Sequence, residues 1–272
     1  MELAQAKASS ELLIRHWREG TTLTALPPPL QPETRADAYL IQSHLASLSA
    51  KPLFGWKIAA TSLAGQRHIA VDGPLAGRLL AEMVYPDGAS LPFGANHMRV
   101  AEAEFAFRMS GDLPPQAAPY SQSEVLAAVA ALHLAIEVPD SRYTDFTLVG
   151  AAQLIADNSC GHQFVLGPEA PASWRDLDLA THRVTGRVGR RLEREGVGGN
   201  VLGDPRIALA WLANELSRHG LTLAKDQVVT TGTCLVPLEI AAGDHVAVDY
   251  GSLGRIACSL PILTDPARAA IK

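Results

Sequence analysis

Two glutamates lie two residues apart in an otherwise apolar stretch of the chain, RVAEAEFAFRM at residues 99–109. Apolar and polar residues alternate there with a period of two, which is typical of a β-strand. On a strand, Glu102 and Glu104 point to the same face, about 7 Å apart along the chain. Two carboxylates on one face repel each other unless water solvates them or a cation lies between them. The stretch therefore predicts either a solvated strand or a cation site.

A third glutamate lies in another apolar segment. Glu137 stands within LAIEVPDSR, which also has the composition of a strand. Because burial of a lone carboxylate is costly, three glutamates within buried strands require a shared partner. Carboxylate oxygens without a neighbouring histidine or cysteine suit a hard divalent cation such as Mg²⁺ or Mn²⁺. On the pattern alone, exposure to solvent or pairing with Arg99 and Arg142 explains these glutamates equally well.

A lysine occurs in a third apolar segment, GWKIAATS at residues 55–62. Lys57 stands between Trp56 and Ile58, where a strand would bury it. Such a lysine either extends its ammonium group to the surface or is held inside a site. If it is held, the ammonium can polarise a carbonyl group or donate a proton.

The first 53 residues predict an N-terminal helical arm. One amphipathic segment ends at Gly20, a proline-rich break follows, and a second amphipathic segment begins at Thr34 and extends to about Ser49. We expect this arm to precede a different architecture.

Residues 54–272 predict a β-rich catalytic core that forms one structural unit. Short apolar strands punctuated by glycine and proline fill this region. Two helices interrupt the strands. One opens with the capping pair Ser121 and Glu124 and extends to about residue 133, and the other opens at Asp204 and Pro205. No strand precedes a GxGxxG motif, so the sequence predicts an α+β fold and not a dinucleotide-binding fold.

The composition is that of a globular protein that binds neither nucleic acid nor membrane. Hydrophobic residues make up 47% of the 272 residues and charged residues 19%, with a net charge of −5. No apolar run approaches the roughly 20 residues that span a bilayer, and the first residues lack the pattern of a signal peptide. Three widely spaced cysteines, Cys160, Cys234 and Cys258, indicate reduced thiols, so we expect a cytoplasmic protein.

Six segments together carry a family resemblance. They are GWKIAATS, AEAEFAFRM, AIEVPDSR, ADNSCGHQFVLG, GDPRIALAWLANEL and TTGTCLVPLEIAAGDHVAVDYGSLG, in this order. From about Phe54 to Leu260, the chain resembles the 2-keto-4-pentenoate hydratase and 4-oxalocrotonate decarboxylase family of the fumarylacetoacetate hydrolase superfamily. The resemblance implies a mixed β-roll core of the fumarylacetoacetate hydrolase C-terminal type behind the helical arm.

The resemblance also implies a set of site residues. The metal ligands of the family fall on Glu102, Glu104 and Glu137, its lysine falls on Lys57, and a substrate-binding segment places Thr233 against the substrate. Mg²⁺ or Mn²⁺ is the implied cofactor. The cation is expected to chelate the carboxylate and the 2-oxo oxygen of a 2-keto acid and to stabilise the enolate formed from it.

The implied activity is that of a metal-dependent lyase on unsaturated 2-keto acids, foremost a 2-keto-4-pentenoate (2-hydroxypenta-2,4-dienoate) hydratase in aromatic catabolism. The segment VDGPLAG departs from the family pattern, because Leu75 replaces the usual acidic residue. An apolar side chain cannot orient water, so a decarboxylase of the 4-oxalocrotonate type is the alternative. Asp72, Asp140 and His68 are candidates for the missing role, although each is more readily explained as a structural residue.

Two further classes remain open. An acylpyruvate C–C hydrolase requires a Glu–His pair beside the metal, which the sequence does not place. A non-catalytic member, such as a partner subunit complexed with a related hydratase or decarboxylase, would bind metal and keto acid without turnover. We expect a homo-oligomer, with the apolar face of the helical arm as the contact.

Overall fold

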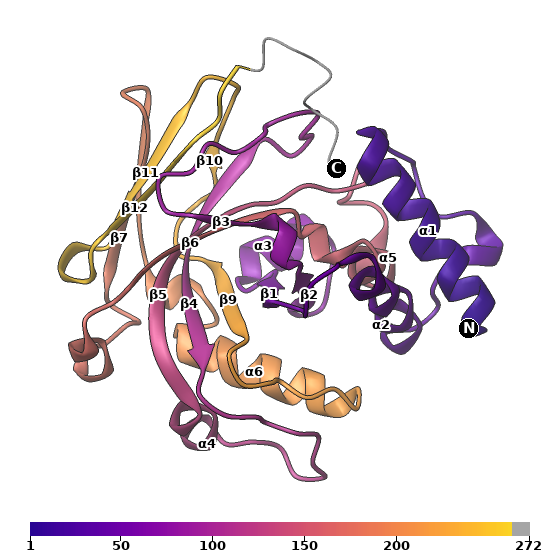
Figure 1. Ribbon diagram of the computed structural model, residues 1–272, viewed down its shortest axis with the longest axis horizontal. Helices are drawn as coiled ribbons and strands as arrows, with labels where there is room; N and C mark the ends of the chain where they lie inside the picture. Colours follow the sequence, from indigo (N-terminus) through magenta and orange to yellow (C-terminus); the bar gives the residue numbers. More distant parts are fainter. Residues whose placement is uncertain (263–272) are drawn as a thin grey trace.

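Two β-sheets of different size form the core of the protein, as seen in the computed structural model, which describes residues 1–262 (Figure 1). The larger sheet has the strand order β2-β1-β9-β4-β5-β6-β3, and β10 also pairs with β4. Its strands are β1 (Gly55–Ala59), β2 (Leu75–Leu79), β3 (Val84–Pro86), β4 (Val100–Met109), β5 (Val129–Val138), β6 (Gln163–Glu169), β9 (Val228–Thr233) and β10 (Leu238–Glu239). Parallel pairs, β1 with β9 and β3 with β6, occur beside antiparallel ones, so the sheet is mixed.

A smaller antiparallel sheet packs beside the first one, with the order β12-β11-β7-β8. Its strands are β7 (Arg183–Val188), β8 (Leu192–Val197), β11 (His245–Asp249) and β12 (Arg255–Ser259). Tyr250 follows β11 and reaches the larger sheet, where its hydroxyl lies 2.8 Å from the carbonyl oxygen of Glu104. The predicted α+β class with a mixed β-roll core is confirmed.

In Figure 1, helices lie to the right of the strands of the larger sheet and below them. They are α1 (Leu3–Glu19), α2 (Arg35–Ser43), α3 (Leu63–His68), α4 (Gln122–Ala127), α5 (Gly150–Ala156) and α6 (Pro205–Arg218). Three predicted helix ends are confirmed. Gly20 ends α1 with a φ of 61°, the Ser121 hydroxyl accepts the amide of Glu124, and the Asp204 carboxylate accepts the amide of Arg206. None of the helices within residues 1–262 is long and apolar enough to cross a membrane.

The sequence-based prediction was wrong for the helix that opens at Ser121. This helix ends at Ala127, and β5 begins at Val129, because residues from Val129 onward pair with β4. The short helices α3 and α5, of six and seven residues, were not predicted at all. Helices of this length carry too little periodicity to be distinguished from turns.

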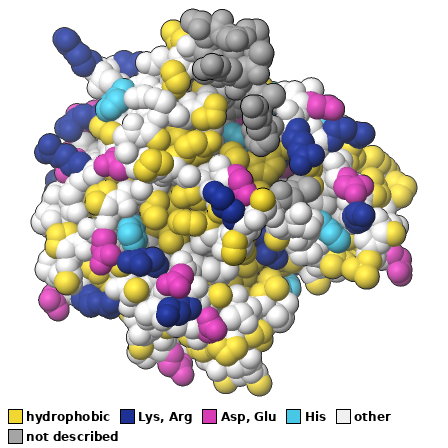
Figure 2. All heavy atoms as spheres, viewed as in Figure 1, with side chains coloured by type: hydrophobic (Ala, Val, Ile, Leu, Met, Phe, Trp, Pro, Cys, Tyr) yellow, Lys and Arg dark blue, Asp and Glu magenta, His cyan; other side chains and the backbone are white. Residues whose placement is uncertain are grey.

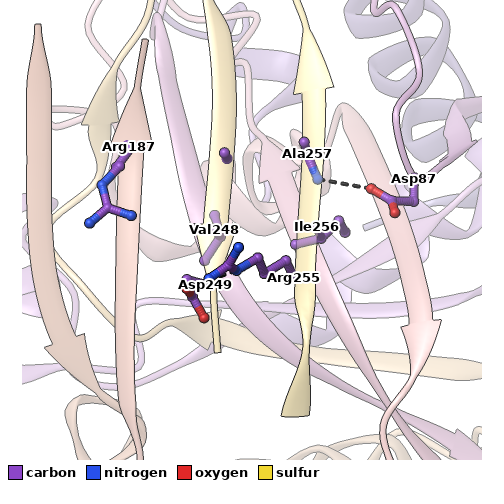
Figure 3. A pocket seen from close by; sticks show the side chains of 8 residues that line it. Asp87, Arg187, Val248, Asp249, Arg255, Ile256 and Ala257 are labelled. Atoms are coloured by element: carbon purple, nitrogen blue, oxygen red, sulfur yellow. Dashed lines mark hydrogen bonds and ion pairs between the residues drawn. The ribbon is translucent and has the colours of Figure 1, made fainter. Parts of the chain in front are cut away.

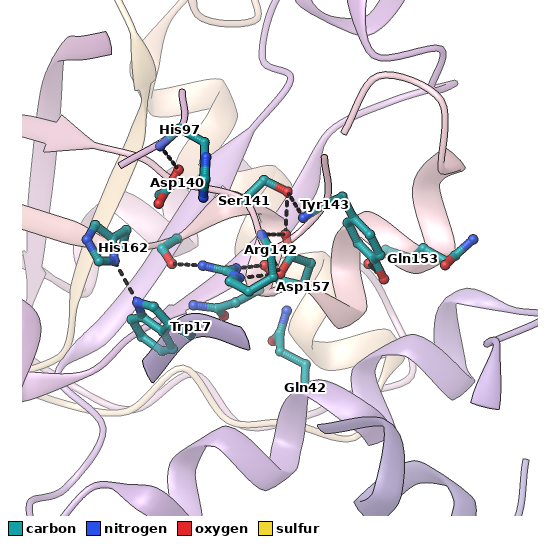
Figure 4. A network of polar contacts seen from close by, with 12 residues as sticks. Trp17, Gln42, His97, Asp140, Ser141, Arg142, Tyr143, Gln153, Asp157 and His162 are labelled. Atoms are coloured by element: carbon teal, nitrogen blue, oxygen red, sulfur yellow. Dashed lines mark hydrogen bonds and ion pairs between the residues drawn. The ribbon is translucent and has the colours of Figure 1, made fainter. Parts of the chain in front are cut away.

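The helical arm docks on the core through both apolar and polar contacts. Trp17 of α1 donates its indole N–H to Nδ1 of His162 at 2.8 Å and stacks on the guanidinium group of Arg142 (Figure 4). Gln42 of α2 donates its amide to the carbonyl oxygens of Ala76 and Ile155. The division of the chain after residue 53 stays a prediction.

On the face shown in Figure 2, basic and acidic side chains are interspersed.

Alternation along β4 sends its side chains to two different environments. Phe105 and Phe107 are fully buried in the main core, where Phe107 packs edge-on against Trp174. Ala106 points to the opposite face of the sheet, where it joins a smaller apolar cluster with Ala135. Glu102 and Glu104 share this second face by the period of two.

The contact between Trp17 and His162 predicts a pH-dependent stability. Because an indole N–H only donates, Nδ1 of His162 must be unprotonated. Burial and the charge of Arg142 lower the pKa of His162 from 6.5 to about 3. Between these pH values the unfolded chain binds this proton and the folded chain does not, so the free energy of unfolding decreases as the pH falls.

We therefore expect the wild type to lose about 2 kcal/mol more stability than His162→Gln when the pH is lowered from 7 to 5. The glutamine can still accept the indole N–H but does not titrate. Urea unfolding at the two pH values measures this difference. Equal losses in the two proteins would contradict a neutral, buried His162.

Candidate metal centre

Three carboxylates converge where β4 and β5 pair. Glu102 lies directly opposite Glu137 in the antiparallel register, and Glu104 follows two residues later on the same face. One carboxylate oxygen from each of the three residues lies within 4.8 Å of the others. Glu104 and Glu137 are fully buried, whereas Glu102 is half-buried. The three predicted ligands are therefore brought together.

Strand β9 fixes the carboxylate of Glu104. One oxygen, Oε2, accepts hydrogen bonds from the Thr230 hydroxyl and from the backbone N–H of Gly232, the latter at 2.8 Å. Gly232 has a φ of 102°, and a Cβ atom there would lie 2.1 Å from the Thr61 hydroxyl oxygen. These bonds leave the other oxygen, Oε1, free to point toward the remaining glutamates.

The remaining carboxylate oxygens fit a cation. Within the described residues, Oε1 of Glu104 and Oε2 of Glu137 are buried and have no protein partner, and Oε1 of Glu137 has only its ion pair with Lys57. Buried polar atoms in proteins are nearly always paired, so acceptors left free in one cluster point to a bound group. A set of carboxylate oxygens is the donor set that Mg²⁺, Mn²⁺ and Ca²⁺ prefer. The residues present therefore fit a hard divalent cation.

Among residues 1–262, Lys57 provides the one positive charge beside these carboxylates. Its Nζ lies 3.2 Å from Oε1 of Glu137 and donates a hydrogen bond of 2.9 Å to the carbonyl oxygen of Ser159. The side chain is 3% exposed, so the ammonium is held inside the protein and does not extend to the surface. Gly77 lies opposite Lys57 in the register of β1 and β2 and leaves room for the lysine stem.

The electrostatics of the cluster follow from burial and mutual repulsion. Desolvation is the largest effect on each glutamate and raises the pKa of all three. For Glu102 and Glu104, the charge of Glu137 raises the pKa further. Desolvation opposes the charged form of Lys57, but the glutamate charges outweigh it, so the pKa of Lys57 is raised and the group is an ammonium ion. The site is therefore rich in negative charge and poor in compensating positive charge.

Two other residues singled out by the sequence lie near this face. Thr233 is opposite Glu104 in the register of β4 and β9, and its hydroxyl donates to the carbonyl oxygen of Leu235 at 2.7 Å. Contact between Thr233 and substrate stays a prediction. Leu75 on β2 is fully buried and shares the face of Gly77, which lies opposite Lys57. An apolar side chain therefore occupies the position where an acid was expected.

The three candidates for the missing acid have other contacts. Asp72 is exposed and pairs with Arg35 at 3.1 Å. Asp140 accepts the backbone amide of His97 at 2.8 Å (Figure 4). The ring of His68 lies edge-on to Phe146 with a centroid separation of 6.0 Å. In residues 1–262, no histidine forms a hydrogen bond with any of the three clustered glutamates, and the Glu–His pair of a hydrolase is not observed there.

A separate cavity of about 320 Å³ lies on the smaller sheet (Figure 3). Arg187, Asp249 and Arg255 line it, and Asp249 pairs with Arg255 at 2.9 Å. None of the clustered glutamates and no part of Lys57 contributes to its wall. This cavity is therefore separate from the carboxylate cluster on β4 and β5.

The carboxylate cluster predicts a metal site that depends on Glu104. We expect metal-stripped wild-type protein to bind one Mn²⁺ in a calorimetric titration, and Glu104→Gln to bind it about 100-fold more weakly, since a ligand charge is removed. Glu169→Gln is the control, because this exposed carboxylate on the same sheet pairs with Arg108. Equally poor binding of Mn²⁺ by wild type and Glu104→Gln would show that the cluster binds no metal.

Comparisons with known proteins agree with this geometry. Residues 52–260 match the family model described as fumarylacetoacetate (FAA) hydrolase C-terminal. The chain is 33% identical over 222 residues to a 2-keto-4-pentenoate hydratase of Burkholderia vietnamiensis, covering 80% of this chain and 83% of the relative. It is 30% identical over 223 residues to a 4-oxalocrotonate decarboxylase of Pseudomonas sp. strain CF600, covering 81% and 83%.

A solved structure resembles almost the whole chain. It is the 4-oxalocrotonate decarboxylase from Pseudomonas putida G7 complexed with magnesium and adipate. The two structures superpose with a TM-score of 0.86 at 26% sequence identity, and the match covers 96% of this chain and 98% of the other. The curled mixed sheet, the carboxylate cluster on it and the matches over most of the chain have one explanation: the protein belongs to the fumarylacetoacetate hydrolase family.

Proposed function

We propose that this protein is a metal-dependent lyase for unsaturated 2-keto acids, and foremost a 2-keto-4-pentenoate hydratase. The observation that carries the proposal is the cluster of Glu102, Glu104 and Glu137, with free buried oxygens beside one buried ammonium group. The relatives named as hydratases support the substrate class, with identities of about 30% over most of both chains. A role in aromatic catabolism is part of the proposal and rests on the family resemblance alone.

The three glutamates would hold Mg²⁺, with Mn²⁺ as the alternative, because both cations accept oxygen ligands. The solved decarboxylase was complexed with magnesium in one structure and with calcium in another, which supports a hard cation. When bound, the cation supplies Lewis-acid stabilisation of the negative charge that develops on the oxygens of a 2-keto acid. Thr230 and Gly232 contribute by fixing one oxygen of Glu104, which leaves the other without a hydrogen-bond partner among residues 1–262.

Lys57 would act on the substrate directly. An ammonium group has three donors. One donates to Ser159, a second faces Glu137, and the third is available for the carbonyl or the conjugated carbon chain of the substrate. A buried ammonium stabilises a developing negative charge more effectively than one in water, because the surroundings do not screen it. Lys57 is therefore the proposed proton donor and electrostatic partner, and Thr233 the proposed substrate contact.

Decarboxylation of a 4-oxalocrotonate-type substrate is the second candidate. Leu75 favours it, since a fully buried apolar residue shares the face of Lys57 and cannot orient a water molecule. Loss of CO₂ requires a place for the released electrons but no attacking water. The likeness of the whole chain to the decarboxylase from Pseudomonas putida G7 also supports this candidate.

Two expectations about partners are part of the same proposal. The substrate is a small 2-keto acid, in line with the adipate and acetate bound to the decarboxylase structures. A cytoplasmic homo-oligomer, or a complex with a related hydratase or decarboxylase subunit, is proposed from the resemblance alone. The acylpyruvate hydrolase activity is not supported, because within residues 1–262 no histidine forms a hydrogen bond with a glutamate of the cluster.

The proposed function predicts metal-dependent turnover that requires Lys57. We expect the absorbance of 2-hydroxypenta-2,4-dienoate to decrease with wild-type protein and Mg²⁺, and kcat to decrease about 100-fold or more in Lys57→Met. Lys7→Met is the control, because Lys7 on α1 is 67% exposed and lies on the helical arm.

The same assay with 4-oxalocrotonate separates the two chemistries. Loss of this substrate with release of CO₂, and no reaction of the dienoate, would favour the decarboxylase. A protein that binds Mn²⁺ but turns over neither compound would contradict both activities and favour the non-catalytic partner subunit.

A further inference from the structure

Three consecutive residues after α5 adopt a backbone conformation that side chains disfavour. Asn158, Ser159 and Cys160 have φ values of 55°, 51° and 60°, and none of them is glycine. Left-handed backbone is sterically unfavourable for such residues, and a run of three persists only where the surroundings fix it. The contacts around this left-handed turn, residues 158–160, must therefore stabilise its backbone conformation.

Asn158 fastens the left-handed turn to the edge of the larger sheet. Its side-chain oxygen accepts the backbone N–H of Arg78 at 2.6 Å, and its side-chain N–H₂ donates to the carbonyl oxygen of Arg78 at 2.9 Å. Arg78 lies on β2, the first strand of the sheet, whose outer backbone groups have no strand to pair with. The amide of Asn158 replaces the missing neighbour strand, and the Ser159 hydroxyl adds a bond to the carbonyl oxygen of Ala76.

Arg142 holds the turn from its other side. This buried guanidinium donates to the carbonyl oxygens of Asp157 and Gly161, the residues immediately before and after the turn. The carboxylate of Asp157 in turn accepts hydrogen bonds from Arg142 and from the Ser141 hydroxyl (Figure 4). Both flanks of the turn are therefore fixed, while Asn158, its first residue, fastens it to β2.

The turn presents one carbonyl group to Lys57. The carbonyl oxygen of Ser159 accepts a hydrogen bond of 2.9 Å from Lys57 Nζ. A Cβ atom on Gly77 would lie 2.4 Å from the carbonyl oxygen of Asn158 and 2.9 Å from Cδ of Lys57. The turn, the glycine and the lysine stem therefore pack in direct contact. Among residues 1–262, the Ser159 carbonyl is the one hydrogen-bond acceptor of Lys57 besides its ion pair with Glu137.

We propose that Asn158 is a positioning residue for the reaction: by fastening the left-handed turn to β2, it fixes the carbonyl group that holds the Lys57 ammonium beside Glu137. A lysine side chain has many rotamers, and a single acceptor on a rigid support selects one of them. The kinetic part of this inference rests on the proposed function, in which Lys57 acts on the substrate. The structural part, that Asn158 holds Lys57 in place, does not depend on any substrate.

Three substitutions separate the side-chain bonds from the backbone requirement. Asn158→Gly keeps the left-handed backbone but removes both bonds to Arg78, and Asn158→Ala removes both and disfavours the backbone. Asn158→Asp keeps an acceptor for the Arg78 amide and tolerates the backbone. Asn214→Ala is the matched control, because Asn214 makes the same pair of bonds to the backbone N–H and carbonyl of Tyr120, at 2.7 and 3.0 Å.

We expect kcat to fall at least about tenfold in Asn158→Gly and Asn158→Ala, with KM changed by less than about twofold. Asn158→Asp should recover part of kcat. Mn²⁺ affinity should stay unchanged in all three, since the glutamates are not altered. Asn214→Ala should show wild-type kcat. Wild-type kcat in Asn158→Gly would overturn the proposal, because the backbone alone would then suffice.

A second measurement does not require turnover. Acetic anhydride labelling, followed by mass spectrometry of the peptide that contains Lys57, reports whether this lysine remains held. We expect little labelling in the wild type and in Asn214→Ala, and at least about fivefold faster labelling in Asn158→Gly. Unchanged labelling of Lys57 in Asn158→Gly and Asn158→Asp would overturn the proposal. If the wild type shows no turnover but Lys57 is labelled faster in Asn158→Gly than in the wild type, the positioning role is supported and only the proposed function is contradicted.

Discussion

The accumulation of buried negative charge is the constraint on which the rest of the structure depends. When all three carboxylates are ionised, as a bound cation requires, the cluster and its one ammonium group carry a formal charge of −2. Two unit charges 4.8 Å apart interact with about 3 kcal/mol even at an effective dielectric constant of 20. A divalent cation brings the formal sum to zero. Without a cation, the repulsion between the carboxylates remains, and the apolar packing behind them must hold the groups together.

Strand β4 joins this packing to the site. Its aromatic residues Phe105 and Phe107 are fixed in the main core, and the period of two then sends the glutamates to the other face. A slip of one residue in the register would turn the glutamates into the main apolar core and move the phenylalanines to the face of the carboxylate cluster. The same contacts that stabilise the fold therefore determine where the carboxylates point. Glycines at positions 77 and 232 then allow close approach where the lysine stem and Thr61 require it.

The sequence predicts the chemical groups of the site better than it predicts what holds them. Glu102, Glu104 and Lys57 are recognisable because a charged residue inside an apolar strand is a local signal, and the family resemblance then assigns their roles. The bond from Thr230 to Glu104 joins residues 126 positions apart, so no local pattern reports it. The sequence also does not predict the left-handed turn at Asn158, because none of its three residues is a glycine, the residue type that usually indicates positive φ. The end of α4 was missed because pairing with β4 outweighs the helical pattern beyond Ala127.

The buried pair of Arg142 and Asp157 connects the helical arm to the lysine. Buried ion pairs often add little stability, because the cost of desolvating both charges offsets their attraction. A guanidinium group nevertheless offers five donors in a fixed plane, and Arg142 directs these donors to carbonyl groups on both sides of the left-handed turn. The ring of Trp17 in the arm lies against the same guanidinium, 5.2 Å from its central carbon. Apolar residues of equal volume could fill this space, but they could not hold two carbonyl groups at defined positions. We infer that the charged pair serves to specify one geometry, and that docking of the arm and placement of Lys57 share a single network.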